Sequence, residues 1–509
     1  MLLSIFLSIF YFSLFTFIIY RASFFSIEGF SRRNITLIFL LKIFFGIALL
    51  EIYSHYYKVR IYGDAFKYYD DAKIIYSAFY THPWDYVRIT FGINSDSPEL
   101  FHYYEKMNNW FLADDYTPFN DSRSVIRFNA LVFPFSFGKY VVHMIFMCFI
   151  SLAGLVALFK VFQKKFPQKV FLLAVAIFLV PSVLFWGSGV LKEGLILFAS
   201  GFLVYFFFRF LEEKKSYQNL LGFCVFCLLM VAIKVHILFS LFPGFIILYW
   251  HSKTLWFSIY KKTFLVGLSA ILFSLVSAQL SQKHNPFHML AQKQKDFVNL
   301  AKGGIYFEKN DALKDTFYVA VKDVKQIFVA ADSVHWQLAE NTIYYKWTKG
   351  DLVDTLKTPL ADNSNYKLIM KLDSSGSKIS LQKLEPTLWS VFKNIPSALL
   401  NSLIRPTIFE AKNFLSLFAA LENLLISILV LVCFLFFKKP TIDEQTIFIF
   451  CSSFVFILFS IAGLTTPVLG ALVRYKIPAL PYLFIVFIIL TDDEKLQKRF
   501  PFLKKIMPQ

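Results

Sequence analysis

Long apolar stretches alternate with short polar segments along most of the chain. A helix that crosses a lipid bilayer needs roughly 20 mostly apolar residues. The sequence predicts about eleven such helices, over residues 2–20, 35–53, 139–159, 169–187, 191–211, 218–235, 237–251, 263–281, 412–437, 446–466 and 472–490. Hydrophobic residues make up 57% of the chain and charged residues 17%, a balance that excludes a water-soluble fold. We therefore expect an all-α polytopic membrane protein.

Two polar segments, residues 54–138 and 282–411, are too long to be simple connections between spans. Loops of this length usually carry function. In the first of them, Val125–Phe137 has the composition of a short helix lying against the membrane surface. The expected divisions of the chain are 1–53, 54–138, 139–281, 282–411, 412–490 and a tail at 491–509.

The second polar segment contains strand-like patterns. Tyr318–Ala331 and Ile343–Trp347 are rich in aromatic and β-branched residues. Tyr366–Leu372 and Lys378–Leu384 flank a turn sequence and predict a β-hairpin. Downstream, Leu388–Leu403 places apolar residues at helical spacing, which predicts an amphipathic helix on the membrane surface. We expect a small β-rich insertion followed by this helix.

The basic residues indicate the orientation. If the spans alternate, the Lys- and Arg-rich short loops and the C-terminal tail all fall on one side, which the positive-inside rule makes cytoplasmic. Both long polar segments are then extracytoplasmic, the N-terminus lies outside and the C-terminus inside, as in a bacterial inner-membrane protein. The net charge of +18 is interpreted as this asymmetry, so no nucleic-acid partner is expected.

Cations and one acidic residue gather at the outer ends of the predicted spans. Phosphate oxygens are bound strongly by Lys and Arg, so such a ring is typical of a site for the headgroup of a phosphate-linked lipid. The alternative is that these cations reach out to the membrane–water interface from helix ends. The candidate substrate-binding residues are Lys192, Glu193, Lys234, His236, Arg405, Arg474 and Lys476, together with Tyr68, Asp71 and Arg127 of the first polar segment.

Carboxylates suited to proton transfer follow the second predicted span. On a helix, Asp64, Tyr68 and Asp71 share one face, and Asp64 is the candidate base that accepts a proton from an attacking hydroxyl. Arg127 is expected to pair with a carboxylate, and Asp121 is interpreted as a turn residue. No cofactor motif is present. A divalent ion, Mg²⁺ or Mn²⁺, held by Asp64 and other oxygens stays an alternative.

Three short motifs resemble those of the C-type (GT-C) membrane glycosyltransferases, including a bacterial subgroup of that superfamily. They are Gly63-Asp-Ala with Tyr68 and Tyr69, Pro181-Ser with Phe185-Trp-Gly-Ser-Gly and Lys192-Glu193, and Arg474-Tyr-Lys-Ile-Pro. The resemblance covers the layout of the whole chain. It implies that Asp64 is the catalytic base and that Arg474 and Lys192 bind the lipid-linked phosphate. The chain departs from that family in having two predicted spans before the acidic loop and no clear paired acidic motif.

The expected function is transfer of a sugar from a polyprenyl-phosphate donor to a glycan, lipid or protein acceptor on the extracytoplasmic face. One alternative is an O-antigen polymerase or ligase, which uses polyprenyl-pyrophosphate glycans. A second is a transporter or flippase, in which charges within the membrane mark a path. A third is a scaffold whose β-rich segment binds a partner in the cell envelope. Apart from these molecules, only membrane lipids are expected as partners.

Overall fold

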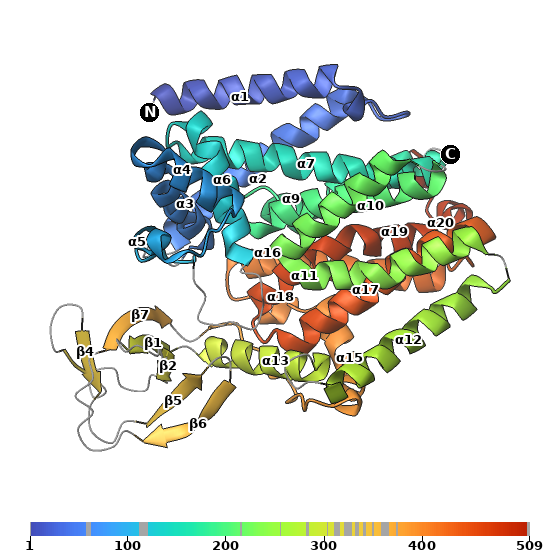
Figure 1. Ribbon diagram of the computed structural model, residues 1–509. Helices are drawn as coiled ribbons and strands as arrows, with labels where there is room; N and C mark the ends of the chain where they lie inside the picture. The colour runs from blue at the N-terminus through green and yellow to red at the C-terminus, as the bar shows by residue number, and fades with distance from the viewer. Residues whose placement is uncertain are drawn as a thin grey trace.

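The protein is a bundle of apolar helices with one polar cap of helices and one group of strands (Figure 1). The computed structural model describes residues 2–56, 63–110, 121–213, 216–254, 256–280, 285–302, 304–309, 316–319, 328–330, 335–338, 343–348, 351–357, 366–372 and 375–505. In the part before the strands, the helices are α1 (Leu2–Arg21), α2 (Arg32–Tyr56), α3 (Asp64–Thr81), α4 (Pro83–Phe91), α5 (Phe101–Tyr104), α6 (Asp121–Ser136), α7 (Tyr140–Lys165), α8 (Val170–Phe178), α9 (Pro181–Trp186), α10 (Lys192–Glu212), α11 (Tyr217–Lys253), α12 (Ile259–Leu280) and α13 (Pro286–Lys302). After the strands come α15 (Leu388–Ile404), α16 (Phe414–Leu435), α17 (Ile442–Thr465), α18 (Leu469–Lys476), the short 3₁₀ helix η7 (Ile477–Ala479), α19 (Leu480–Leu490) and α20 (Asp493–Arg499).

Within the described ranges, nine helices are long and apolar enough to cross a membrane, so the chain is an all-α polytopic membrane protein. This count is lower than the expected eleven. The predicted span 169–187 is interrupted between α8 and α9, where Pro181 starts a new helix. The predicted spans 218–235 and 237–251 are joined in α11.

The backbone of α11 leaves the helical region at Lys234, with φ −164° and ψ 83°. Phe223 and Phe245 would be about 33 Å apart in one straight helix, yet their ring centroids are 5.5 Å apart. The two limbs of α11 therefore fold back on each other, and Lys234 lies at the reversal. A charged residue is accommodated there because the turn lies beside the polar cap, where Ser124 Oγ on α6 donates to Ala232 O.

Close packing of α7 on α10 fixes the start of α10. A Cβ atom on Gly201 would lie 1.9 Å from the carbonyl oxygen of Gly154, so only glycine allows this approach. The turn between α9 and α10 is held by the carbonyl oxygen of Gly187. This oxygen accepts hydrogen bonds from Lys42 Nζ at 3.0 Å and Ser151 Oγ at 2.7 Å. These contacts place Lys192 and Glu193 at the first turn of α10.

The first long polar segment forms a cap of helices, α3 to α6, over one end of the bundle (Figure 1). The prediction of helices here is confirmed, and α6 covers the predicted Val125–Phe137 except for Phe137, which follows its last residue. Tyr76 on α3 stacks on Phe133 of α6 with ring centroids 5.2 Å apart. Tyr69 Oη donates to the carbonyl oxygen of Gly138 at 2.7 Å. The cap is thus tied to the start of α7.

At the opposite end of the bundle, polar contacts join the other connections. Gln163 Nε2 donates to the carbonyl oxygen of Glu28 at 3.0 Å, and Lys169 Nζ pairs with Asp493 at 2.7 Å. The backbone N–H of Lys438 donates to the carbonyl oxygen of Leu490 at 2.7 Å. The bundle therefore has one end that carries the cap and another, near the C-terminus, that carries Lys-rich connections.

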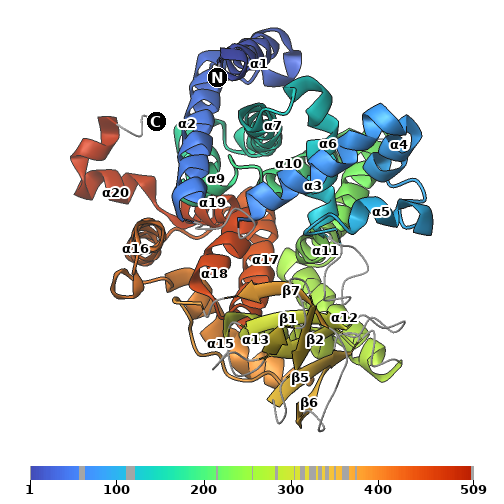
Figure 2. The same ribbon diagram turned by 90° about the vertical axis from the view of Figure 1, so that its left-hand side faces the viewer.

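Between α13 and α15 the described residues form strands arranged in the order β3-β4-β7-β1-β2-β5-β6, with antiparallel neighbours. Figure 2 shows them on the side of α13 and α15, away from α1. The strands are β1 (Gly304–Lys309), β2 (Thr316–Val319), β3 (Phe328–Ala330), β4 (His335–Leu338), β5 (Ile343–Thr348), β6 (Asp351–Lys357) and β7 (Tyr366–Leu372).

The predicted hairpin between Tyr366–Leu372 and Lys378–Leu384 is wrong. β7 pairs with β1 and β4. Lys378 instead bridges to Val468, and the backbone N–H of Ile379 donates to the carbonyl oxygen of Pro467 at 2.8 Å. Composition alone indicated an extended segment, but the partner that satisfies its backbone is the junction between α17 and α18. The predicted helix at Leu388–Leu403 is present as α15.

Candidate functional site

A cavity of about 110 Å³ lies where the cap meets the helix bundle. Its walls come from α3, the starts of α10 and η7, the reversal in α11, and the end of α18. Apolar side chains of Ile196, Ile237, Ala471 and Pro478 line part of it. Its polar lining is Asp64, Tyr68, Lys192, Glu193, Lys234, His236, Arg474 and Tyr475.

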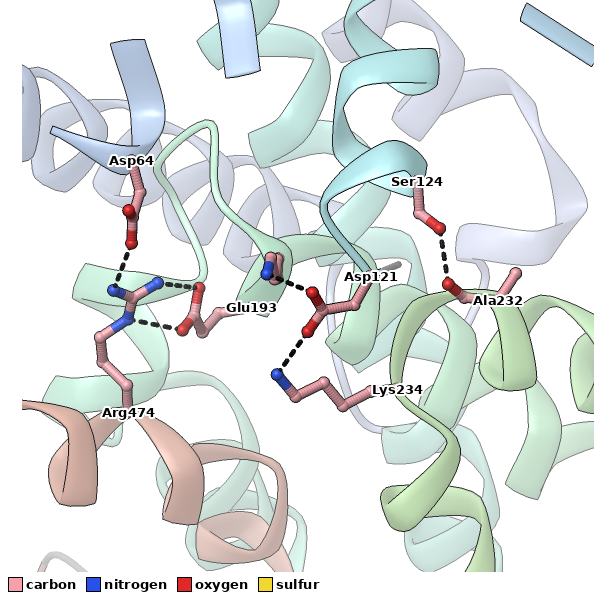
Figure 3. A network of polar contacts seen from close by, with 8 residues as sticks. Asp64, Asp121, Ser124, Glu193, Ala232, Lys234 and Arg474 are labelled. Atoms are coloured by element: carbon pink, nitrogen blue, oxygen red, sulfur yellow. Dashed lines mark hydrogen bonds and ion pairs between the residues drawn. The ribbon is translucent and has the colours of Figure 1, made fainter. Parts of the chain in front are cut away.

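Arg474 organises one end of this cavity (Figure 3). Its Nε and Nη2 atoms donate to the two oxygens of Glu193 at 2.7 and 3.3 Å. Its Nη1 donates to Asp64 Oδ2 at 3.1 Å, and its Cζ lies 5.2 Å from the ring centroid of Trp186. One guanidinium thus binds two carboxylates, which the planar fork of Arg allows and a Lys ammonium would not match. We call Asp64, Glu193 and Arg474 the carboxylate end.

Asp121 organises the other end (Figure 3). Its Oδ1 accepts from Lys192 Nζ at 2.6 Å and its Oδ2 from Lys234 Nζ at 2.7 Å. Lys192 Nζ also lies 5.6 Å from the ring centroid of Tyr68, and Lys234 Nζ 5.2 Å from that of Tyr475. Here one carboxylate is shared by two cations. We call Asp121, Lys192, Lys234 and the other charged residues close to them the lysine end.

The carboxyl groups of Asp64 and Asp121 are ionised. Burial alone would raise the pKa of Asp64, but the positive charges of Arg474, Lys67 and Lys192 outweigh it and lower the pKa below its ordinary value. The pKa of Asp121 is lowered as well, because Lys234 and Lys192 outweigh the effect of burial. The Asp64 side chain is 38% exposed, so it is a charged carboxylate that a ligand in the cavity can reach.

Tyr68 lies between the two ends. Burial raises the pKa of Tyr68 well above its ordinary value, and the negative charges of Asp64 and Asp121 act in the same direction. The side chain therefore stays a neutral hydroxyl, able to donate a hydrogen bond. Its ring packs against the Lys192 ammonium.

The structure brings together seven of the residues predicted from sequence as site residues: Asp64, Tyr68, Lys192, Glu193, Lys234, His236 and Arg474. They come from distant parts of the sequence, since Asp64 and Arg474 are 410 positions apart. Their arrangement around one cavity is the reason to treat it as the candidate functional site.

Two residues of the first polar segment that were predicted to contact substrate, Asp71 and Arg127, lie outside the cavity lining. Asp71 is buried and accepts the backbone N–H groups of Asn108 and Asn109, each at 2.7 Å. Arg127 donates to the carbonyl oxygen of Ile89 at 2.9 Å and to Ser95 Oγ at 3.0 Å, rather than to a carboxylate as expected. Both hold loops of the cap in place. Helical spacing put Asp71 on the face of Asp64, but it could not show that a nearby loop covers it.

Two predicted cations near the C-terminal helices also lie elsewhere. Arg405 pairs with Glu410 at 3.5 Å. Lys476 is fully buried and donates to the carbonyl oxygen of Ser402 at 3.0 Å and to the side-chain oxygen of Asn423. Lys476 is the last residue of α18. It points away from Arg474 because the two residues are two positions apart on a helix.

Sequence reasoning missed two charged residues of the lysine end. Asp121, interpreted as a turn residue, is the first residue of α6 and binds both lysines. Lys293, on α13, received no assignment. The spacing of Phe287, Leu290 and Phe297 is helical and would have indicated α13, but not which of its lysines faces the site.

The described residues do not form a site that fits a divalent metal. No group of three or more His, Cys, Asp or Glu side chains converges among them. The carboxylates of the cavity are each bound to cations, Asp64 and Glu193 to Arg474 and Asp121 to two lysines. Cationic neighbours of this kind oppose binding of Mg²⁺ or Mn²⁺.

Comparison of the chain with protein-family models, curated proteins and solved structures finds no match. The arrangement of the cavity residues has to carry any functional conclusion.

Proposed function

We propose that the protein is a membrane glycosyltransferase that moves a sugar from a polyprenyl-phosphate donor to a glycan, lipid or protein acceptor. The observation that carries this proposal is the pairing of an ionised, partly exposed carboxylate, Asp64, with a neighbouring excess of Lys cations in one cavity. Transfer of a sugar from a lipid phosphate needs both a base for the acceptor hydroxyl and positive charge for the phosphate.

In the proposed reaction, the acceptor O–H donates its proton to Asp64 as its oxygen attacks the anomeric carbon. The bond between that carbon and the phosphate oxygen breaks, and the phosphate leaves with the electron pair. Attack opposite the leaving group inverts the anomeric configuration. Asp64 suits the role of base because it is ionised. Arg474 orients it through the hydrogen bond at 3.1 Å.

The positive charge of the cavity stabilises the reaction only if it faces the departing phosphate. The phosphate in a sugar-linked donor carries one negative charge, and the released lipid phosphate carries two. Lys ammonium groups close to it therefore interact more strongly with the product-like transition state than with the donor. Such differential binding is what lowers a barrier.

The proposal places the cavity on the extracytoplasmic side of a bacterial inner membrane. The end of the bundle opposite the cap carries Lys164, Lys165, Lys169 and Lys438, which the positive-inside rule assigns to the cytoplasm. With both limbs of α11 and the α8–α9 pair counted as crossings, the N-terminus lies outside and the C-terminus inside. The strands between α13 and α15 then form an extracytoplasmic insertion.

The test is the substitution Asp64→Asn, assayed with a labelled polyprenyl-phosphate sugar in proteoliposomes. The amide keeps the shape of the side chain but is a far weaker base, so transfer should fall by about 100-fold or more. Asp70→Asn on the same helix is the matched control, because Asp70 does not line the cavity. Undiminished transfer by Asp64→Asn at normal membrane levels would remove the proposal.

Transport or flipping of a lipid-linked precursor is the second candidate. It is favoured by the ion pair that links α10 to α18 within the apolar bundle, since charges between spanning helices can mark a path. Movement of the labelled lipid across the bilayer, without any change in its headgroup, would identify this function. A donor with a pyrophosphate-linked oligosaccharide as the only substrate would instead identify a polymerase or ligase.

A further inference from the structure

Helix α13 contributes a cation to the lysine end of the cavity. Lys293 lies close enough to Lys234, Lys192 and Asp121 for their charges to act on its ammonium. Burial, together with repulsion by the two neighbouring lysines, lowers the pKa of Lys293 to about 8. Three lysines therefore share a region in which Asp121 is the carboxylate bound to two of them. The lysine end has more positive than negative charge.

The position of Lys293 is fixed by contacts on both sides of it. Phe297, one turn further along α13, stacks on Tyr475 of α18 with centroids 5.9 Å apart and an interplanar angle of 22°. Lys293 Nζ lies 5.6 Å from the Phe297 centroid, as Lys234 Nζ lies 5.2 Å from that of Tyr475. The two ammonium groups thus each pack against a ring of the same stacked pair.

The adjacent residue, Gln294, locks α13 against the bundle. Its Nε2 donates to the carbonyl oxygens of Gln382 at 3.0 Å and Leu464 at 2.7 Å, and its Oε1 accepts from the N–H of Leu384 at 2.9 Å. A buried amide with this many hydrogen bonds holds one rotamer and one register. The helix therefore holds Lys293 near Lys234 and Lys192 of the cavity lining as a fixed feature of the fold.

Lys293 and His236 differ from the other charged groups of the cavity in their hydrogen bonding. Within the described ranges, neither the Lys293 ammonium nor the His236 ring has a hydrogen-bond partner or a carboxylate in contact. Both side chains lie in the partly buried region between α11 and α13, beside Lys234. A partly buried ammonium that lacks an acceptor from the protein keeps its N–H donors free to bind an anion.

We propose that Lys293 and His236, together with Lys192 and Lys234, form a binding subsite for a phosphate group. The inference rests on the proposed function for the identity of the ligand, the phosphate of a lipid-linked donor. It assigns the phosphate to the lysine end and away from Arg474, whose donors are already bound to Glu193 and Asp64. It also makes α13, in the second polar segment, part of the substrate site.

The test measures binding of a polyprenyl phosphate to the full-length protein in nanodiscs. Lys293→Gln should weaken binding about tenfold, the loss expected for one charge-assisted hydrogen bond. Lys302→Gln removes the same charge from an exposed position of α13 and should leave affinity unchanged. Lys293→Arg keeps the charge and should retain most of the affinity. Equal affinities for Lys293→Gln and the wild type would overturn the subsite.

Inorganic phosphate as a competitor distinguishes the two sources of the ligand. If it displaces the lipid only weakly, and in a manner that depends on Lys293, the subsite takes the phosphate of a lipid. If inorganic phosphate binds as tightly as the lipid, with the same dependence on Lys293, the subsite takes a free anion. Binding by either ligand that ignores Lys293 contradicts the subsite.

The outcome is separable from that of the proposed function. Lys293-dependent phosphate binding, in a protein that transfers no sugar, would keep the subsite and remove the transferase. Sugar transfer that depends on Asp64, with phosphate binding that ignores Lys293, would do the reverse.

Discussion

The two ends of the cavity are built from the same kinds of residues in opposite proportions. At the carboxylate end, two acids surround one cation, Arg474. At the lysine end, Asp121 is shared by two lysines, with Lys293 nearby. An end where carboxylates outnumber cations can accept a proton, whereas an end with surplus cations can bind an anion. The contrast indicates that a transfer reaction is supported by the way charges are divided between the two ends, more than by the total charge of the cavity.

The largest effect should follow removal of the cation at the carboxylate end. Arg474→Met leaves Glu193 buried, with its side chain 6% exposed and its bidentate partner gone. Loss of one partner from a buried ion pair costs about 3 to 5 kcal/mol. The variant should unfold at a lower temperature in detergent and accumulate poorly in membranes.

The control for that variant is Arg474→Lys, which keeps the charge but loses the fork that binds two carboxylates. Its unfolding temperature should lie between those of the wild type and Arg474→Met. If Arg474→Met unfolds at the wild-type temperature, the ion pair does not hold the carboxylate end together.

A smaller effect should appear when pH changes the charge of the lysine end. The ammonium form of Lys293 binds phosphate and the neutral form should bind as weakly as Lys293→Gln, so affinity should fall as pH rises through about 8, by about fivefold between pH 7 and pH 9. A phosphate monoester has its second pKa near 6 and is already a dianion over this range. The effect is measured as the affinity of a polyprenyl phosphate for the protein in nanodiscs at several pH values. The groups that face Lys293 or its ring partner are Lys192, Lys234, His236, Asp121 and Tyr475.

The control for the pH series is Lys293→Arg, because a guanidinium stays charged throughout. Its phosphate affinity should change little over the same range. The same loss in Lys293→Arg would assign the pH dependence to another group and weaken the comparison between the two ends.

The smallest effect is expected at a cation that belongs to neither end. Arg405→Gln removes a partly exposed ion pair with Glu410, an interaction that contributes at most about 1 kcal/mol. Transfer and donor affinity should change by less than about twofold in proteoliposomes. A tenfold loss of donor affinity would place the phosphate near α15 instead of the lysine end.

The sequence predicted the class of fold because apolar stretches of bilayer length leave few alternatives. It did not predict the limits of every span. The Pro181 break and the reversal at Lys234 depend on which neighbours satisfy the backbone, as Glu422 does when it accepts the N–H of Ser182 at 2.6 Å. The Lys378–Leu384 segment was assigned a wrong partner for the same reason.

The candidate site was predictable where charge at a helix start is costly. Lys192, Glu193 and Arg474 were found because charged residues beside apolar spans need an explanation. Asp121 and Lys293 lie in polar segments, where charges are ordinary. Only the folded chain shows that Asp121 meets two lysines and that Lys293 faces them. The reverse error was made for Lys476, whose buried partners are Ser402 and Asn423.

The most direct test of the division between the two ends is the kinetics of Asp64→Asn and Lys293→Gln with one labelled polyprenyl-phosphate sugar. Asp64→Asn should lower kcat by about 100-fold and leave the donor Kd nearly unchanged. Lys293→Gln should raise the donor Kd about tenfold. If Asp64→Asn turns over as fast as the wild type, or if both variants change only the donor Kd, the carboxylate end is not the place where the proton is transferred.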